Sequence, residues 1–333
     1  MSTAAAVVDM HVHIIVPEIT RDHGREPWRP RVVRDGGRQR IEMDGVEVRS
    51  VRHEFVDPEA LLAETAAAGS DRVVLCPFVG LLRYDAEPED TLDSGRIQNA
   101  ALAALVRAHP DRVAALGTVP LQDPTLAARE LEAVVRSGLA GVEIAASARG
   151  VYLGDDRFRR FWEAADALRA VVFIHPTTRG FDIPAFARFH LANAVGNPFE
   201  TTITAADLVM SGVLESHPGL RVVLAHGGGA ILALRGRLRH AHEHVAAARV
   251  RLGTSPEESL RRFYFDTIVH DATLLRQLVA YAGPDHVVLG SDYPFDMGVE
   301  RPAEGVRALG LAPDDERQIL GGNAMRLLSE GHA

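Results

Sequence analysis

Residues 7–15 read VVDMHVHII, a short run rich in β-branched residues that is typical of a buried strand. The next regular pattern is helical, because its apolar residues recur every three or four positions. This alternation continues through the chain. Strand-like runs occupy residues 7–14, 72–76, 113–119, 141–146, 171–175, 221–225, 262–267 and 286–290, and helical patterns occupy residues 58–68, 94–108, 124–137, 156–168, 199–216, 230–248, 272–282 and 314–320. Eight strand–helix pairs in series predict an α/β fold, a (β/α)8 TIM barrel, rather than an open doubly wound sheet.

One interval, residues 17–57, does not fit the alternation. It is polar and rich in arginine, and it contains turn signals at residues 35–37 and 44–45. Short β patterns flank these turns. The interval therefore predicts a small β-hairpin insertion after the first strand, as a subdomain of a single barrel that spans residues 1–333.

The charge composition excludes several function classes. The chain has 36 basic and 45 acidic residues, and every basic residue is arginine. Without lysine there is no Schiff-base chemistry and no P-loop lysine. The acidic balance, with no continuous basic stripe, argues against nucleic acid as a partner. One cysteine cannot form an internal disulfide, and no segment has about 20 uncharged apolar residues, so we expect a cytoplasmic protein without membrane spans.

Polar side chains follow several of the predicted strands, at the barrel face where active sites lie. His11 and His13 are two residues apart, so they point to the same side of a strand. His175 and His226 follow two further strands, and Asp292 follows the last. Imidazoles with one carboxylate form a natural site for a borderline divalent ion and leave a position for water. The pattern predicts a metal-dependent enzyme.

Six motifs make the sequence resemble the amidohydrolase-type barrels of the aminocarboxymuconate semialdehyde decarboxylase group. They occur in the family's order over almost the whole chain. The motifs are DMHVH at residues 9–13, VPLQD at 119–123, HP at 175–176, HGGG at 226–229, LGSDYPF at 289–295 and GNA at 322–324.

The resemblance implies that four of these side chains bind one divalent metal, zinc or alternatively manganese: His11, His13, His175 and Asp292. It implies that His226 stands beside the metal-bound water and transfers protons. The implied reaction is non-oxidative decarboxylation of a small aromatic or muconate-semialdehyde-type carboxylic acid. The implied assembly is a homodimer.

Further residues are matched to the family's substrate site. Arg49 lies in the segment that resembles the one carrying the substrate arginine, although Arg52 is close enough to be the match instead. Arg237 matches an arginine that reaches the neighbouring subunit's site. Phe189 stands where the family's decarboxylase carries tryptophan. We expect Phe189 and Phe295 to line an apolar wall.

His270, three residues past the seventh strand, is a candidate for an additional acid or substrate donor, with a structural or helix-capping role as its alternative. The reaction also has an alternative. A hydrolase or hydratase acting on a related carboxylic acid, lactone or amide would use the same site, because the sequence does not separate attack on a substrate from protonation of it. A barrel that binds metal or a partner without catalysis is a third interpretation, which metal content without turnover of any carboxylate would favour. Release of CO2 would distinguish the decarboxylase from the hydrolase or hydratase.

Overall fold

The computed structural model describes residues 6–21, 26, 28–35, 38–43, 46–48, 52–177 and 183–329. Every strand-like run of the alternating pattern contains a parallel strand. These strands are β1 (Val8–Ile14), β5 (Arg72–Pro77), β6 (Val113–Ala115), β7 (Gly141–Ala145), β10 (Val171–His175), β11 (Arg221–Leu224), β12 (Tyr264–Asp266) and β13 (Val287–Val288). The alternation of strands and helices is therefore confirmed, with β6, β12 and β13 shorter than predicted.

The parallel strands form two sheets, in the orders β1-β5-β6 and β13-β12-β11-β10-β7. Backbone hydrogen bonds cross both junctions between the sheets. At one junction Gly117 N–H donates to Gly141 O, at 2.8 Å, and at the other Met10 N–H donates to Leu289 O, also at 2.8 Å. Because the strands are parallel, their carboxyl ends lie on one side of the molecule, and the side chains after these ends meet there.

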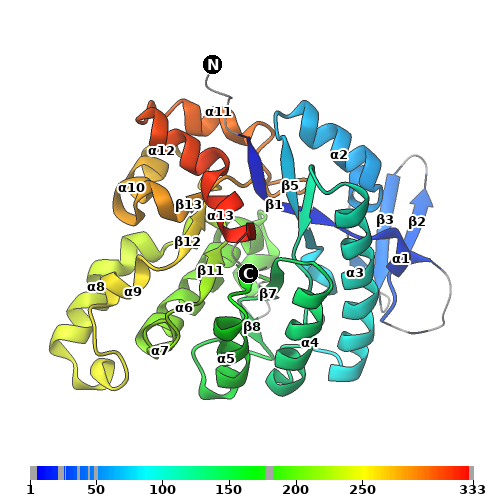
Figure 1. Cartoon of the computed structure of the whole chain (residues 1–333). Coiled ribbons are helices and arrows are strands. Elements are labelled where there is room, and N and C mark those ends of the chain that lie inside the picture. The colour runs from blue at the N-terminus through cyan, green and yellow to red at the C-terminus, as the bar shows by residue number, and fades with distance from the viewer. Residues whose placement is uncertain are drawn as a thin grey trace.

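The helices surround the parallel strands in Figure 1. The main helices are α2 (Pro58–Ala67), α3 (Pro88–Ala108), α4 (Pro124–Arg136), α5 (Arg159–Ala167), α6 (Asn197–Met210), α8 (Ile231–His244), α10 (Ala272–Ala282) and α12 (Pro313–Arg317). The helical pattern over residues 199–216 is divided into α6 and α7 (Val213–Ser216), because Gly212 adopts a left-handed conformation with φ of 75°. Shorter helices are α1 (Pro17–Thr20), α9 (Pro256–Leu260), α11 (Pro302–Arg307) and α13 (Asn323–Ser329). No helix in these described ranges is both long enough and apolar enough to span a membrane.

The interval after β1 contains an antiparallel sheet with three strands, β2 (Arg31–Asp35), β3 (Arg38–Met43) and β4 (Val46–Val48). It lies at the edge of the molecule in Figure 1. Both turn signals of the sequence separate its strands. Ile41 of β3 is buried in the hydrophobic core, and it attaches the small sheet to the rest of the fold.

The parallel strands have a core on each side. Residues such as Ile144 and Leu224 pack toward the helices, whereas Met10, Cys76 and Phe173 form a second cluster on the opposite face of the strands. Leu327 and Leu328 of α13 join this second cluster.

Helix α13 lies against the amino ends of the strands. The guanidinium of Arg221, the first residue of β11, donates to the carbonyl oxygen of Leu327 at 3.1 Å. The guanidinium of Arg326 donates to the carbonyl oxygen of Asp285, shortly before β13, at 2.6 Å. The carboxyl ends of the strands, on the other side, stay open for a functional site.

Candidate metal centre and active site

Strand β1 contains a β-bulge that sets the position of the first two imidazoles. The pairing of β1 with β5 shifts between Asp9 and Val12. A bulge re-aims side chains locally, and the ring of His11 packs against Phe173 of the inner cluster, with the centroids 4.7 Å apart. The carboxylate of Asp9 accepts the His11 N–H at 3.1 Å and the Ser291 N–H at 3.0 Å. This carboxylate therefore joins the bulge to the chain after β13.

Five side chains from four strand ends converge. His11 Nε2 is 2.9 Å from His13 Nε2. Asp292 Oδ1 lies 3.3 Å from His11 Nε2, 3.1 Å from His13 Nε2 and 3.9 Å from His175 Nε2. His226 Nε2 is 3.3 Å from Asp292 Oδ2. The structure thus brings together every residue that the sequence predicted for the metal, and His226 with them.

The outer nitrogens of three imidazoles already have acceptors. His11 Nδ1 donates to Asp266 at 2.8 Å, His13 Nδ1 to the Pro77 carbonyl at 3.1 Å, and His175 Nδ1 to the Pro176 carbonyl at 2.8 Å. An imidazole that donates from Nδ1 presents a lone pair at Nε2. His175 Nε2 is buried and has no hydrogen-bond partner. Lone pairs that face one another around a carboxylate fit a divalent cation.

The protonation states also suit a cation. Burial lowers the pKa of His175 to about 3, which keeps this imidazole neutral. Burial acts to raise the pKa of Asp292, but the surrounding imidazoles, His11 first among them, hold it well below its ordinary value. A neutral imidazole and an ionised carboxylate are the forms that bind metal.

Geometry alone does not divide the roles among the histidines. The ligand atoms of His11, His175, His226 and Asp292 all lie within 4.8 Å of one another. The predicted set instead contains His13 in place of His226. His226 differs from the others in burial, since 14% of its side chain is exposed against 0% for His11 and His13.

Asp266 is a buried carboxylate beside the cluster that the sequence did not single out as a site residue. Its Oδ2 accepts the His11 Nδ1–H at 2.8 Å and the His226 backbone N–H at 3.0 Å, and its Oδ1 accepts the Gly227 N–H at 2.8 Å. Burial acts to raise the pKa of Asp266, but the hydrogen bond and charge of His11, the charge of His226 and the hydrogen bond from Gly227 together lower it. The signal in the sequence was a carboxylate at the last position of a strand.

Glu143 of β7 is a second buried carboxyl group at the site. Both of its oxygens lack a hydrogen-bond partner, and Oε1 lies 3.7 Å from His13 Nδ1. Burial raises the pKa of Glu143 to about 8. The group is therefore a proton-binding site inside the fold, next to a predicted metal ligand.

His226 faces a cavity of about 310 Å³ that His270 also lines. Burial acts to lower the pKa of His226, but the hydrogen bond and the charge of Asp292 outweigh it and raise the pKa. His226, His270 and Asp292 have φ values of 55°, 53° and 58°. Left-handed backbone at non-glycine residues costs free energy and is concentrated at active sites. Three adjacent strand ends share it here.

The two predicted wall residues lie in different surroundings. Phe295 packs against the ring of His13, with the centroids 4.9 Å apart, and against Phe55 at 5.0 Å. Phe189 is 79% exposed, and its ring contacts only the guanidinium of Arg188 among the aromatic and cation–π contacts of the described residues. In the single chain the segment before α6 holds Phe189 at φ of 55° with its side chain exposed, so its role in an apolar wall stays a prediction.

Two of the three candidate substrate arginines lie within the described residues. Arg49 lies outside the described residues. The guanidinium of Arg52 lies 5.6 Å from the centroid of the Tyr293 ring. Arg237 is exposed on α8.

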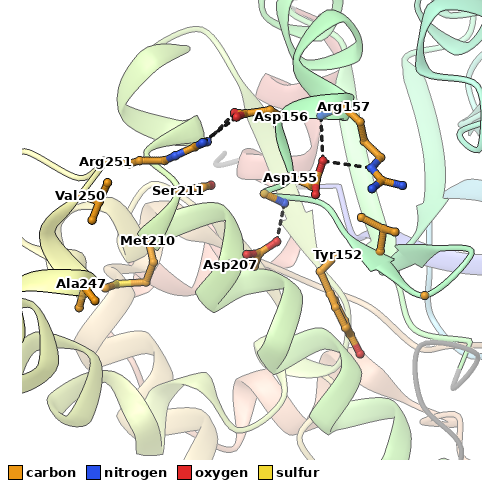
Figure 2. Close-up of a pocket in the computed structure, with 14 residues that line it drawn as sticks. Tyr152, Asp155, Asp156, Arg157, Asp207, Met210, Ser211, Ala247, Val250 and Arg251 are labelled. Atoms are coloured by element: carbon orange, nitrogen blue, oxygen red, sulfur yellow. Dashed lines mark hydrogen bonds and ion pairs between the residues drawn. The ribbon is translucent and has the colours of Figure 1, made fainter.

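A larger cavity, of about 620 Å³, shares no residue with the histidine cluster. Figure 2 shows that its charged groups are already paired: Asp156 with Arg251, Asp155 with Arg157, and Asp207 with the Gly154 N–H. No imidazole lines this cavity. Its size therefore does not make it the better candidate, and the chemistry favours the strand ends.

Known proteins resemble this chain over nearly its full length. It is 29% identical over 328 residues to the 2-amino-3-carboxymuconate-6-semialdehyde decarboxylase of Dictyostelium discoideum, covering 96% of this chain and 91% of that protein. The structure of 5-carboxyvanillate decarboxylase from Sphingomonas paucimobilis superposes with a TM-score of 0.82 at 26% identity, over 97% of this chain and 99% of that one.

A third similar protein was solved with a bound metal. The 5-carboxyvanillate decarboxylase of Novosphingobium aromaticivorans, complexed with manganese and 4-hydroxy-3-methoxy-5-nitrobenzoic acid, has a TM-score of 0.81 at 20% identity, over 97% of this chain and 96% of that one. These likenesses imply a TIM-barrel-type α/β fold. Residues 8–329 match the family described as amidohydrolase. The resemblance inferred from the sequence motifs is confirmed, and the chain belongs to the amidohydrolase family.

Proposed function

We propose that this protein is a metal-dependent non-oxidative decarboxylase of a small aromatic or muconate-semialdehyde-type carboxylic acid. The observation that carries the proposal is the position of His226, which contacts Asp292 of the histidine cluster and also lines a cavity. A titratable group between a cation site and a substrate-sized space is suited to proton transfer. The decarboxylase activity of the relatives named above supports the same reaction.

We propose His11, His13, His175 and Asp292 as the metal ligands, with zinc as the ion and manganese as the alternative that the manganese-containing neighbour supports. The bound ion would supply Lewis acidity that stabilises negative charge on substrate oxygens. Asp266 orients His11 through Nδ1 and fixes the backbone of His226. Outer carboxylates of this kind hold a ligand imidazole in one tautomer and one orientation.

The reaction also requires the transfer of one proton to the substrate carbon. When the bond between the ring carbon and the carboxylate breaks, its electron pair stays on the carbon, CO2 leaves, and the carbon takes one proton. His226 Nε2 is the proposed carrier of that proton, since Asp292 raises the pKa of this imidazole. His270 lines the same cavity and is the proposed second donor.

We assign substrate anchoring to the segment with Arg49, or Arg52 in its place, and to Arg237 from a second copy of the chain. Guanidinium groups bind carboxylates in a bidentate manner. Phe295, beside His13, is the proposed apolar wall. The proposed homodimer has support from exposed apolar side chains on α6 and on the segment that leads into it, namely Ile183, Phe189, Val195, Phe199 and Ile203.

We also infer that the parallel strands close into one barrel spanning residues 1–333, with residues 17–57 as the inserted subdomain. The hydrogen bonds across both junctions between the sheets support closure. The single cysteine, Cys76, is buried and offers no disulfide, so we propose a cytoplasmic location.

The test is elemental analysis of the purified protein, followed by CO2 detection with hydroxybenzoates, aminobenzoates and muconate semialdehydes. We expect about one metal ion per chain and CO2 from at least one acid. Metal without CO2 from any acid would contradict the decarboxylase and favour a hydrolase or hydratase. Absence of bound metal after loading with zinc or manganese would contradict the whole site.

A further inference from the structure

The cavity beside His226 has a neutral polar side that none of the roles above uses. Asn193 and Asn197 line it together with His226 and His270. The other lining side chains are apolar, among them Ile268 and Met297, and none of them is arginine. Its volume of about 310 Å³ is near the lower end of small-molecule sites, which suits a single ring.

Both asparagines lie on one helical segment that borders the cavity. Residues Ala192–Gly196 form a π-helical turn that continues into α6 at Asn197. π-Helical turns inside helices are frequent at functional sites. Residues four apart on a helix lie on one face, and both asparagines line the same cavity. The turn therefore brings two amide-bearing residues to the wall of one cavity.

Neither carboxamide has a hydrogen-bond partner among the described residues. An amide offers both a donor and an acceptor. A hydroxyl or carbonyl group of a ligand would satisfy them, because it also accepts and, as a hydroxyl, donates. The described residues that line the cavity offer no guanidinium to a second carboxylate, which would lose its hydration there without a charged partner from these residues.

We propose that Asn193 and Asn197 are specificity-determining residues that recognise a neutral hydroxyl or carbonyl substituent on the substrate ring. The inference rests on the proposed function, because it assumes that the reacting carboxylate lies at the histidine cluster. It narrows the substrate to a hydroxy- or oxo-substituted acid with one carboxylate. Sites that hydrogen-bond a substrate hydroxyl discriminate strongly against analogues that lack it, because their polar groups are then unpaired.

The experiment measures calorimetric binding of benzoate, 2-hydroxybenzoate, 3-hydroxybenzoate and benzene-1,3-dicarboxylate to the zinc-loaded enzyme. The variants are Asn193→Leu and Asn197→Leu, which remove the polar atoms at nearly constant size. Val245→Ala is the control, since Val245 follows α8, is exposed and does not line the cavity. One metal ion per chain in each variant establishes that the site is intact.

We expect the wild type to bind at least one hydroxybenzoate about tenfold more tightly than benzoate or the dicarboxylate. Each Asn→Leu variant should lose about fivefold or more of this preference with little change for benzoate, and Val245→Ala should keep it. A preference that survives both Asn→Leu changes would overturn the inference, as would tight binding of the dicarboxylate or no binding of any hydroxybenzoate. These binding measurements do not require turnover of the ligand. Failure of the decarboxylase itself appears separately, as binding without CO2.

Discussion

Asp266 Oδ2 accepts the Nδ1–H of His11 at 2.8 Å, and the same carboxylate accepts the backbone N–H groups of His226 and Gly227. One side chain thus orients a proposed metal ligand and fixes the residue proposed to carry the proton. The relationship joins β12 to the ends of β1 and β11. A substitution of Asp266 should therefore affect both metal binding and catalysis.

Asp266→Asn should weaken metal affinity by about 10- to 100-fold, because the amide no longer offers an anionic acceptor to His11. Isothermal titration of the metal-free protein with zinc measures the effect. Asp271→Asn is the control, since Asp271 only caps α10 by accepting the Leu274 N–H. Equal zinc affinity in the wild type and the Asp266 variant would show that this carboxylate has no role at the metal.

His226→Asn should keep the metal and lose turnover by roughly 10²- to 10⁴-fold, which is the usual contribution of a positioned proton-transfer group. Metal content and the rate of CO2 release are measured on the same preparation. His109→Asn, at the end of α3 and outside both groups of possible ligand atoms, serves as the control. Loss of the metal in the His226 variant would instead make His226 a ligand, in agreement with the alternative grouping of ligand atoms.

Glu143→Gln should make the metal-free protein less sensitive to alkaline pH. Burial raises the pKa of Glu143 from 4.5 to about 8, so the folded state binds this proton more tightly than the unfolded state. The stability that the proton provides is complete below about pH 4.5 and is lost as the pH rises toward about 8.

The free energy of unfolding in urea, measured from pH 5 to pH 9, tests this prediction. The advantage of the variant over the wild type should grow with pH, by up to a few kcal/mol, since one pKa unit corresponds to about 1.4 kcal/mol. Glu132→Gln is the control on an exposed site. Parallel curves for the wild type and Glu143→Gln would contradict a buried proton at this position.

Arg237→Ala and His226→Asn should complement each other if Arg237 acts in the partner's site. Each variant alone should be nearly inactive. A refolded equimolar mixture should recover roughly one quarter of wild-type activity, because half of the dimers are mixed and half of their sites are complete. Recovery to this level supports shared sites. A mixture as inactive as its parts, with a dimer verified by sedimentation, would place Arg237 outside the partner's site.

Much of the fold could be predicted because each strand and helix carries its own local pattern. The two-residue spacing of His11 and His13 predicted one shared side, and both imidazoles meet Asp292. The bulge that helps to position them depends on the Asp9 carboxylate and on Ser291, which is distant in sequence. A local pattern carries no information about such a partner.

Other features of the site could not be predicted from the sequence for the same reason, which is that they depend on the folded structure. Asp266 looks like any polar residue at the end of a strand until three N–H groups are seen around its carboxylate. Asn193 and Asn197 gave no signal, because the π-helical turn breaks the periodicity on which helix recognition relies. The role of Phe189 was predicted only from its matching position in the family, and in the structure its backbone is left-handed and its ring is exposed to solvent.

The position of α13 has a practical consequence for handling the enzyme. This helix covers the amino ends of the strands and ends at Ser329, on the side opposite the histidine cluster. A solid support coupled beyond that helix would hold the molecule with its reacting face directed toward the bulk solution. Immobilisation from this end should therefore leave substrate entry and gas release unobstructed in a packed-bed reactor.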